Sequence, residues 1–199
     1  RDSETAELAI HAALTGHLVL STLHTNTAVG AIPRLMDMGI QPFLLSSSLK
    51  LVIGQRLVRK ICSECKGEKA EISPAVALMI KKELSKASDG VLNDLNIKRE
   101  DIDSGSFKLF EGKGCPKCLK TGMKGRIGIF EVLDVNEKIN QLINKEAGEG
   151  EIEKTALEDG FTLMKQDGII KALQGVTTIE EVQRVTEDDS EEEVIQAKG

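Results

Sequence analysis

The sequence contains no tryptophan and no tyrosine, and aromatic residues make up only 3% of its 199 residues. Hydrophobic residues still account for 40%, so we expect a core built from Leu, Ile, Val and Ala. Basic side chains are outnumbered by acidic ones, and the formal net charge is −6. The negative charge and the scarcity of stacking side chains argue against a protein that binds nucleic acid.

Long apolar runs and a leader sequence are also missing. No apolar stretch approaches the roughly 20 residues that cross a bilayer, and no signal peptide is visible, so we expect a cytoplasmic protein. The first residue is Arg1 rather than Met, which suggests a fragment, a processed product or a trimmed chain. The length suffices for one large domain or two small ones.

The four cysteines form two Cys-x-x-Cys pairs, Cys62/Cys65 and Cys115/Cys118. This spacing places two sulfurs on one side of a tight turn, where both reach an ion at about 2.3 Å. Residues 66–114 form a longer insert than the roughly 15–20 residues of a compact zinc ribbon. We therefore expect zinc to join the two ends of an inserted subdomain, as a structural site with no open position. Metal-free cysteines and disulfide or redox chemistry remain alternatives.

The hydrophobic pattern predicts helices that alternate with strands at the start of the chain. The expected order is a helix over 2–16, a strand over 17–23, and helices over 27–38 and 43–53. This rhythm predicts an α/β layer with parallel strands.

The rest of the chain is predicted to be mainly helical, with three further strands. We expect strands over 54–62, 107–114 and 124–134, and helices over 74–86, 137–145, 151–158, 162–173 and 179–185. The run of like charges "DDSEEE" at 188–193 predicts a disordered end.

The segment "GHLVLSTLHTN", residues 16–26, contains two histidines. In a straight strand His17 and His24 would lie on opposite faces and more than about 20 Å apart, so they could not share one small ligand. The end of this strand is the edge where open α/β sheets bind ligands. Hydroxyls, an amide and an imidazole suited to sensing a phosphate gather there: Ser21, Thr22, His24, Thr25 and Asn26. Alternatively, His17 packs at the start of the strand and His24 caps the next helix.

A phosphate-binding cradle is missing, because the chain has no G-x-x-x-x-G-K-[ST] motif. Arg56, Arg59 and Lys60 either bind an anion or a neighbouring subunit, or form a solvated strand face.

Three segments of the chain have patterns beyond composition. The N-terminal segment from Arg1 to Cys62 contains the histidine run and "GQRLVRKIC", and the later segments are "GRIGIFEVLDV" at 125–135 and "DGFTLMKQDGIIKALQGVTTIEEVQRVT" at 159–186. Together they resemble a known family, the ATPases of type II secretion and type IV pilus assembly. The two cysteine pairs and the two later segments are similar to the assembly and secretion branch of that family. The resemblance covers about residues 1–187.

This resemblance implies a fold and a function. The fold would be a partial RecA-like P-loop ATPase domain, an α/β parallel sheet with flanking helices, with an inserted zinc subdomain and a helical C-terminal region. The parent protein would be a cytoplasmic hexamer that binds ATP and Mg²⁺ and docks on an inner-membrane platform. It would drive assembly of a pilus or pseudopilus.

The resemblance also implies roles for residues. The histidine run would lie beside the γ-phosphate, with His24 and His17 as catalytic residues and nucleotide contacts from Thr22, Thr25, Asn26 and Arg56. Arg1 and Asp2 resemble the end of the Walker B segment. ATP hydrolysis also needs a Walker A cradle and a Mg²⁺ site, which this chain lacks, so we expect the chain alone to hydrolyse little or no ATP.

The expected domains follow the chain in order. Residues 1–61 form the C-terminal half of the ATPase domain, 62–123 the zinc subdomain, 124–187 a strand with the helical region, and 188–199 an acidic tail. The alternative function is a zinc-stabilised module that binds a platform protein or a neighbouring subunit and has no ATPase activity.

Overall fold

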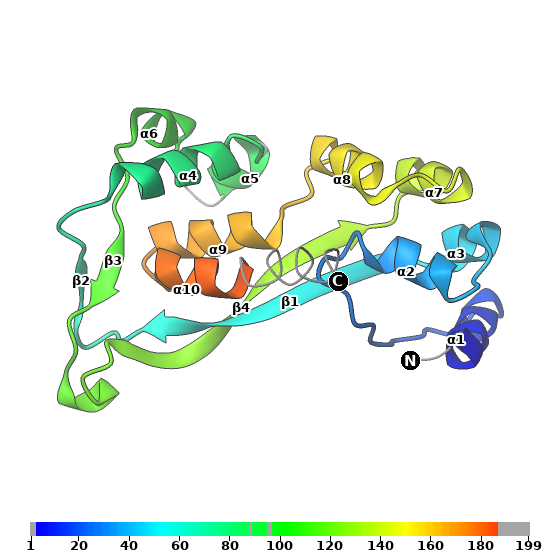
Figure 1. The fold of residues 1–199 in the computed structure, drawn as a ribbon, viewed down its shortest axis with the longest axis horizontal. Helices are drawn as coiled ribbons and strands as arrows, with labels where there is room; N and C mark the ends of the chain where they lie inside the picture. The colour runs from blue at the N-terminus through cyan, green and yellow to red at the C-terminus, as the bar shows by residue number, and fades with distance from the viewer. Residues whose placement is uncertain (1–2, 88, 95–96, 187–199) are drawn as a thin grey trace, which may run out of the picture. The chain divides into compact units, whose positions relative to one another are not determined.

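The computed structural model describes residues 3–87, 89–94 and 97–186 (Figure 1). Its helices are α1 (Ser3–Leu14), α2 (Ala31–Asp37), α3 (Pro42–Ser48), α4 (Pro74–Leu84), α5 (Asp89–Asp94), α6 (Arg99–Ser104), α7 (Glu137–Asn144), α8 (Glu149–Glu158), α9 (Met164–Leu173) and α10 (Ile179–Thr186). Its strands are β1 (Leu51–Ile61), β2 (Lys66–Glu68), β3 (Phe110–Gly112) and β4 (Met123–Asp134), with one 3-10 turn at Pro116–Cys118. The predicted acidic end lies outside the described residues.

The chain divides into two compact units that interleave along the sequence. The first unit comprises Arg1–Gly54 and Glu131–Phe161, and the second comprises Gln55–Phe130 and Thr162–Gly199. The predicted domain boundaries follow the chain instead, and they stay a prediction.

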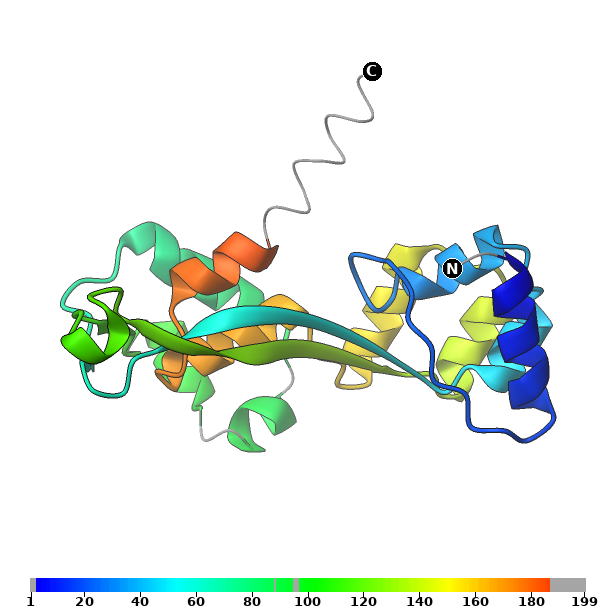
Figure 2. The same cartoon turned by 90° about the horizontal axis from the view of Figure 1, so that it is seen from below.

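In the first unit, α1 packs against α3, α3 packs against α7, and α7 packs against α8 (Figure 2). Pro42 occupies the first turn of α3, where its missing N–H costs nothing. The Asn136 side chain caps α7 by accepting the N–H of Ile139 at 3.1 Å. The fully buried apolar side chains of this unit include Ile32, Leu45, Leu133, Ile139, Ile143 and Ile152.

In the second unit, α9 lies beside α10 and against α4 (Figures 1 and 2). The buried cluster that joins these helices contains Ile80, Leu84, Leu92, Ile102, Leu109, Ile169, Ile170, Ile179 and Val182. A smaller cluster joins the strands to α9 through Val58, Ile129 and Met164. A Cβ on Gly168 would lie 2.6 Å from Val182, so this glycine permits the close approach of α9 and α10.

The described strands form two two-stranded sheets, β1 with β4 and β2 with β3. β2 and β3 are antiparallel, with Lys66 opposite Gly112 and Glu68 opposite Phe110. β1 and β4 also run in opposite directions, because Val135 donates to Lys50 and Cys62 donates to Gly122. The mixed α/β class is confirmed, but the described residues do not form the predicted parallel pairing.

The predicted strand over 17–23 was wrong. This segment has no regular secondary structure, and Leu18 and Leu20 are 89% and 88% exposed. A strand is stable only when a neighbour pairs with its backbone, and no described strand pairs with this one. The helix predicted over 43–53 ends at Ser48, and its last residues belong to β1 instead.

None of the helices within the described ranges has the length and hydropathy needed to cross a membrane.

Candidate functional site

The short β2–β3 pair brings the two cysteine pairs together. β2 begins directly after Cys65, and β3 ends three residues before Cys115, so pairing of these strands aligns the two Cys-x-x-Cys turns. Lys113 donates its N–H to the Cys65 carbonyl at 3.0 Å, which extends this pairing to the first turn. Residues far apart in the sequence therefore meet at one end of the second unit.

The four sulfurs lie within 4.8 Å of one another. The Cys62–Cys115 and Cys65–Cys118 sulfur distances are 3.9 and 3.8 Å, and the Cys115–Cys118 distance is 3.7 Å. Four sulfurs placed tetrahedrally at about 2.3 Å from an ion would lie about 3.8 Å apart. The donor set and its spacing therefore fit a tetrahedral zinc ion, and the sulfurs are much too far apart for disulfides.

Backbone N–H groups point at the sulfur of Cys118. Cys115 donates its N–H to this sulfur at 3.2 Å, and Gly122 donates at 3.3 Å. The hydrogen bond from Cys115 is the main reason that the pKa of Cys118 falls to about 6. A thiolate is the form that binds a metal, so the turn favours the ligand state of Cys118, whereas burial raises the pKa of Cys65 to about 12.

Two glycines allow the backbone to close around the cysteines. A Cβ on Gly112 would lie 2.0 Å from the carbonyl oxygen of Gly122, and a Cβ on Gly122 would lie 2.4 Å from that of Gly112. Gly122 also has a φ of 73°, a conformation that favours glycine. The sequence gives no sign of the contact between Gly122 and Gly112.

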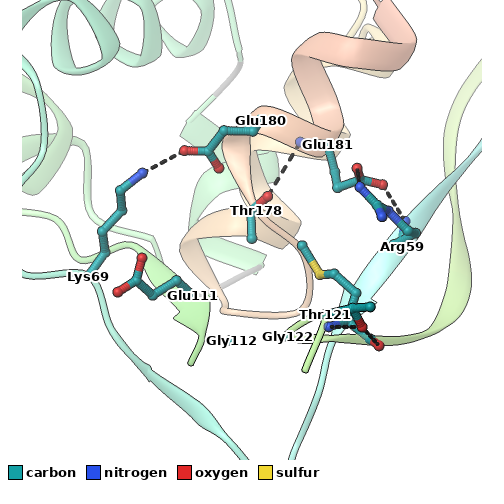
Figure 3. A pocket seen from close by; sticks show the side chains of 10 residues that line it. Arg59, Lys69, Glu111, Gly112, Thr121, Gly122, Thr178, Glu180 and Glu181 are labelled. Atoms are coloured by element: carbon teal, nitrogen blue, oxygen red, sulfur yellow. Dashed lines mark hydrogen bonds and ion pairs between the residues drawn. The ribbon is translucent and has the colours of Figure 1, made fainter. Parts of the chain in front are cut away.

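A pocket of about 250 Å³ lies in the second unit (Figure 3). Charged side chains line it in pairs: Lys69 contacts Glu180 at 2.5 Å, and Arg59 contacts Glu181 at 2.6 Å. Thr121 and Gly122 form the side nearest the cysteines. Glu111 lines the pocket as a third carboxylate, so the lining contains two basic and three acidic side chains and indicates no particular ligand.

The histidine segment lies in the first unit, and most of its polar side chains are exposed to solvent. His17, Thr22, His24 and Asn26 are exposed, and Thr25 is half-buried. His17 Nδ1 lies 3.1 Å from the Thr15 hydroxyl and 3.3 Å from the Ala12 carbonyl, which ties this ring to the end of α1. His17 therefore makes a local contact with the C-terminal end of α1, which the sequence did not predict.

The end of the histidine segment is anchored more firmly than its beginning. The Thr25 hydroxyl donates to the Thr27 carbonyl at 3.0 Å, and the Thr27 hydroxyl donates to Glu149 of α8 at 2.6 Å. Ala28 donates its N–H to the carboxylate of Glu131 on β4. Sequence reasoning missed Glu131, although a charged residue between Ile129 and Leu133 on the buried face of a strand is a recognisable signal.

Arg56 lies on β1 in the second unit, where it is half-buried. The structure thus brings the four predicted metal ligands together in the second unit. The other predicted nucleotide contacts, Thr22, Thr25 and Asn26, belong to one short segment of the first unit. The catalytic and nucleotide-binding roles of these residues stay predictions.

The fold and the cysteine cluster define a class, a mixed α/β protein with four clustered cysteines that could hold a metal ion. The sequence profile of the family described as "Type II/IV secretion system protein" matches residues 1–184. The chain belongs to this family.

Individual relatives agree with this assignment. The chain is 47% identical to the type II secretion system ATPase E of Vibrio cholerae over 94% of its length, and 43% identical to the type IV pilus assembly ATPase PilB of Pseudomonas aeruginosa over 94%. It covers 33% and 30% of those proteins, so it spans about a third of the curated relatives.

Two solved structures share the fold. The ATPase DotB of Legionella pneumophila and the pilus retraction motor PilT with bound ADP each match 93% of the chain with a TM-score of 0.54. Their sequence identities are 18% and 24%, and the chain covers 36% and 37% of them. The chain therefore shares the mixed α/β fold of these two structures over 93% of its length.

Proposed function

We propose that this chain is the C-terminal part of a motor ATPase that couples ATP hydrolysis to type II secretion or to assembly of a pilus or pseudopilus. The observation that carries the proposal is the match to ATPases of both systems over 94% of the chain. In this proposal the whole protein is a cytoplasmic hexamer held at the inner membrane by a platform protein, and it does not bind nucleic acid.

The proposed chemistry assigns the histidine segment to the nucleotide. ATP and Mg²⁺ supply the phosphate to be transferred and the charge that neutralises it. His24 would orient groups at the γ-phosphate with support from His17, and Thr22, Thr25, Asn26 and Arg56 would contact the nucleotide. The exposure of His24 and Asn26 supports this assignment, because both side chains are accessible to a ligand.

ATP turnover in the longer protein and in the 199-residue chain tests this function. We expect phosphate release from the longer protein and none above background from the chain alone, which has no phosphate-binding loop. A longer protein without turnover, or a chain that turns over at the same rate, would refute the proposal.

The four cysteines are proposed to hold structural zinc. All four thiolates would bind the ion, which leaves no open position for a substrate. The spacing of the sulfurs at 3.7 to 3.9 Å supports this assignment.

Cys115→Ser tests the zinc site. We expect zinc content to fall from about one ion per chain to well below half, with a loss of about 3 kcal/mol or more in the free energy of unfolding. Lys117→Ser is the matched control, because Lys117 lies in the same turn and makes an exposed ion pair with Glu64 at 2.9 Å, which contributes about 1 kcal/mol at most. Equal zinc content in both variants would rule out the site.

A second candidate function is supported by the completeness of the cysteine site within this chain. A zinc-stabilised module could bind a platform protein or a neighbouring subunit without hydrolysing ATP. Zinc binding together with an inactive longer protein would favour this module over the motor.

A further inference from the structure

Glu131 is a carboxylate buried in the first unit, where charged side chains are costly unless they are hydrogen-bonded. It belongs to β4 and is only 4% exposed. Its Oε1 atom accepts the N–H of Ala28, a residue more than 100 positions away and itself 1% exposed. The side chain therefore fixes a distant piece of backbone inside the unit.

Gly54 leaves the room that Glu131 needs. Gly54 lies within β1, where glycine weakens a strand and marks a close approach. A Cβ at this position would lie 2.7 Å from Cγ of Glu131 and 2.8 Å from its Oε1. The absence of a side chain at Gly54 thus allows the carboxylate to occupy its present position.

The backbone that Glu131 holds lies two residues beyond the end of the histidine segment. Ala28 follows His24 by four residues and leads into α2, which begins at Ala31. A second carboxylate, Glu149 of α8, accepts the hydroxyl of Thr27 at 2.6 Å, and that hydroxyl accepts the N–H of Gly30 at 2.9 Å. Carboxylates from β4 and α8 therefore fix this end of the segment together.

The anchor matters for His24 because its side chain is exposed and has no core packing to hold it. The position of such a side chain depends on the backbone that carries it. We infer that Glu131 is a positioning residue, which sets the place of His24 by accepting the N–H of Ala28 with a carboxylate that occupies the space left open by Gly54. This inference rests on the proposed function for its catalytic consequence, but the coupling of Glu131 to His24 is a property of the chain itself.

Glu131→Met is the decisive variant, because Met keeps the length of the side chain and removes the acceptor. Glu131→Gln is the conservative variant, since an amide oxygen still accepts the N–H of Ala28. Gly54→Ala displaces the Glu131 side chain but keeps its carboxylate. This variant tests the inference if Glu131→Met does not fold. Glu181→Met is the matched control, because it removes a buried carboxylate that accepts the N–H of Arg59 in the second unit.

The first readout uses the 199-residue chain labelled with ¹⁵N-histidine, which gives three backbone signals. We expect Glu131→Met and Gly54→Ala to shift or broaden the His24 signal and leave that of His11 unchanged. Glu131→Gln should restore the His24 signal, and Glu181→Met should not move it. An unchanged His24 signal in a folded Glu131→Met or Gly54→Ala chain would overturn the inference.

The second readout is ATP turnover of the longer protein. A displaced catalytic side chain predicts a fall in kcat of up to about 100-fold with little change in KM, largely restored in Glu131→Gln. Full kcat in Glu131→Met would overturn the inference while leaving the motor proposal intact. An inactive unmodified protein would refute the motor, and the histidine signals would still decide the coupling.

Discussion

At the scale of single residues, Glu181 shows how a buried charge is stabilised in the second unit. Its carboxylate accepts the N–H of Arg59 at 3.0 Å, the Arg59 guanidinium at 2.6 Å and the Arg184 guanidinium at 3.1 and 3.2 Å. The hydrogen bond from the Arg59 side chain is the main cause that lowers the pKa of Glu181 to about 2. The carboxylate therefore links β1 to α10.

This lowered pKa predicts a dependence of stability on pH. Because the pKa is below its ordinary value of 4.5 in the folded state, the stabilisation is complete above pH 4.5 and is lost as the pH falls towards 2. It amounts to at most about 3 kcal/mol. Urea unfolding at pH 7 and pH 3 measures it, with Glu181→Gln as the reference that cannot ionise.

We expect the difference in unfolding free energy between the natural chain and Glu181→Gln to be clearly smaller at pH 3 than at pH 7. A difference that stays constant between these pH values would contradict the assigned pKa.

At the scale of elements, the cysteine turns and the β2–β3 pair depend on two glycines. A Cβ on Gly112 would lie 2.0 Å from a backbone oxygen, and backbone cannot move aside as a flexible side chain can. We predict that Gly112→Ala lowers the free energy of unfolding by about 3 kcal/mol or more. Thermal unfolding and zinc content should both report the change.

Gly150→Ala is the opposite case among the glycines. Gly150 lies in α8, and a Cβ there meets nothing within 4 Å. Alanine favours a helix more than glycine does, so this variant should raise stability by about 0.5–1 kcal/mol. Equal effects of the two substitutions would show that close backbone approach does not govern Gly112.

The sequence predicted most elements, because their signals are local. Ser73 and Pro74 mark the start of α4, Asn136 marks that of α7, and the apolar pattern of 124–134 identifies β4. The error at 17–23 has a different cause. An apolar run predicts a strand only where a partner strand exists, and periodicity contains no information about the partner.

The candidate sites were predictable to different degrees for a similar reason. The Cys-x-x-Cys spacing encodes a tight turn, so the four ligands could be named from the sequence, and the structure brings them together. The anchor between Glu131 and Ala28 joins residues with no local relation. Only the tertiary fold reveals it.

At the scale of the whole molecule, the chain contains a complete cysteine cluster but only part of what phosphoryl transfer needs. It spans about a third of its curated relatives, and it has no phosphate-binding loop. In the proposed function, the histidine segment is one part of a nucleotide site, which other parts of the longer protein or a neighbouring subunit would complete.

The most direct test of the central claim is ATP turnover by the longer protein with His24→Ala. His11→Ala is the matched control, because His11 is also exposed and lies on α1. We expect a fall in kcat of about 100-fold or more for His24→Ala and unchanged turnover for His11→Ala. Unchanged turnover in a folded His24→Ala protein would contradict it.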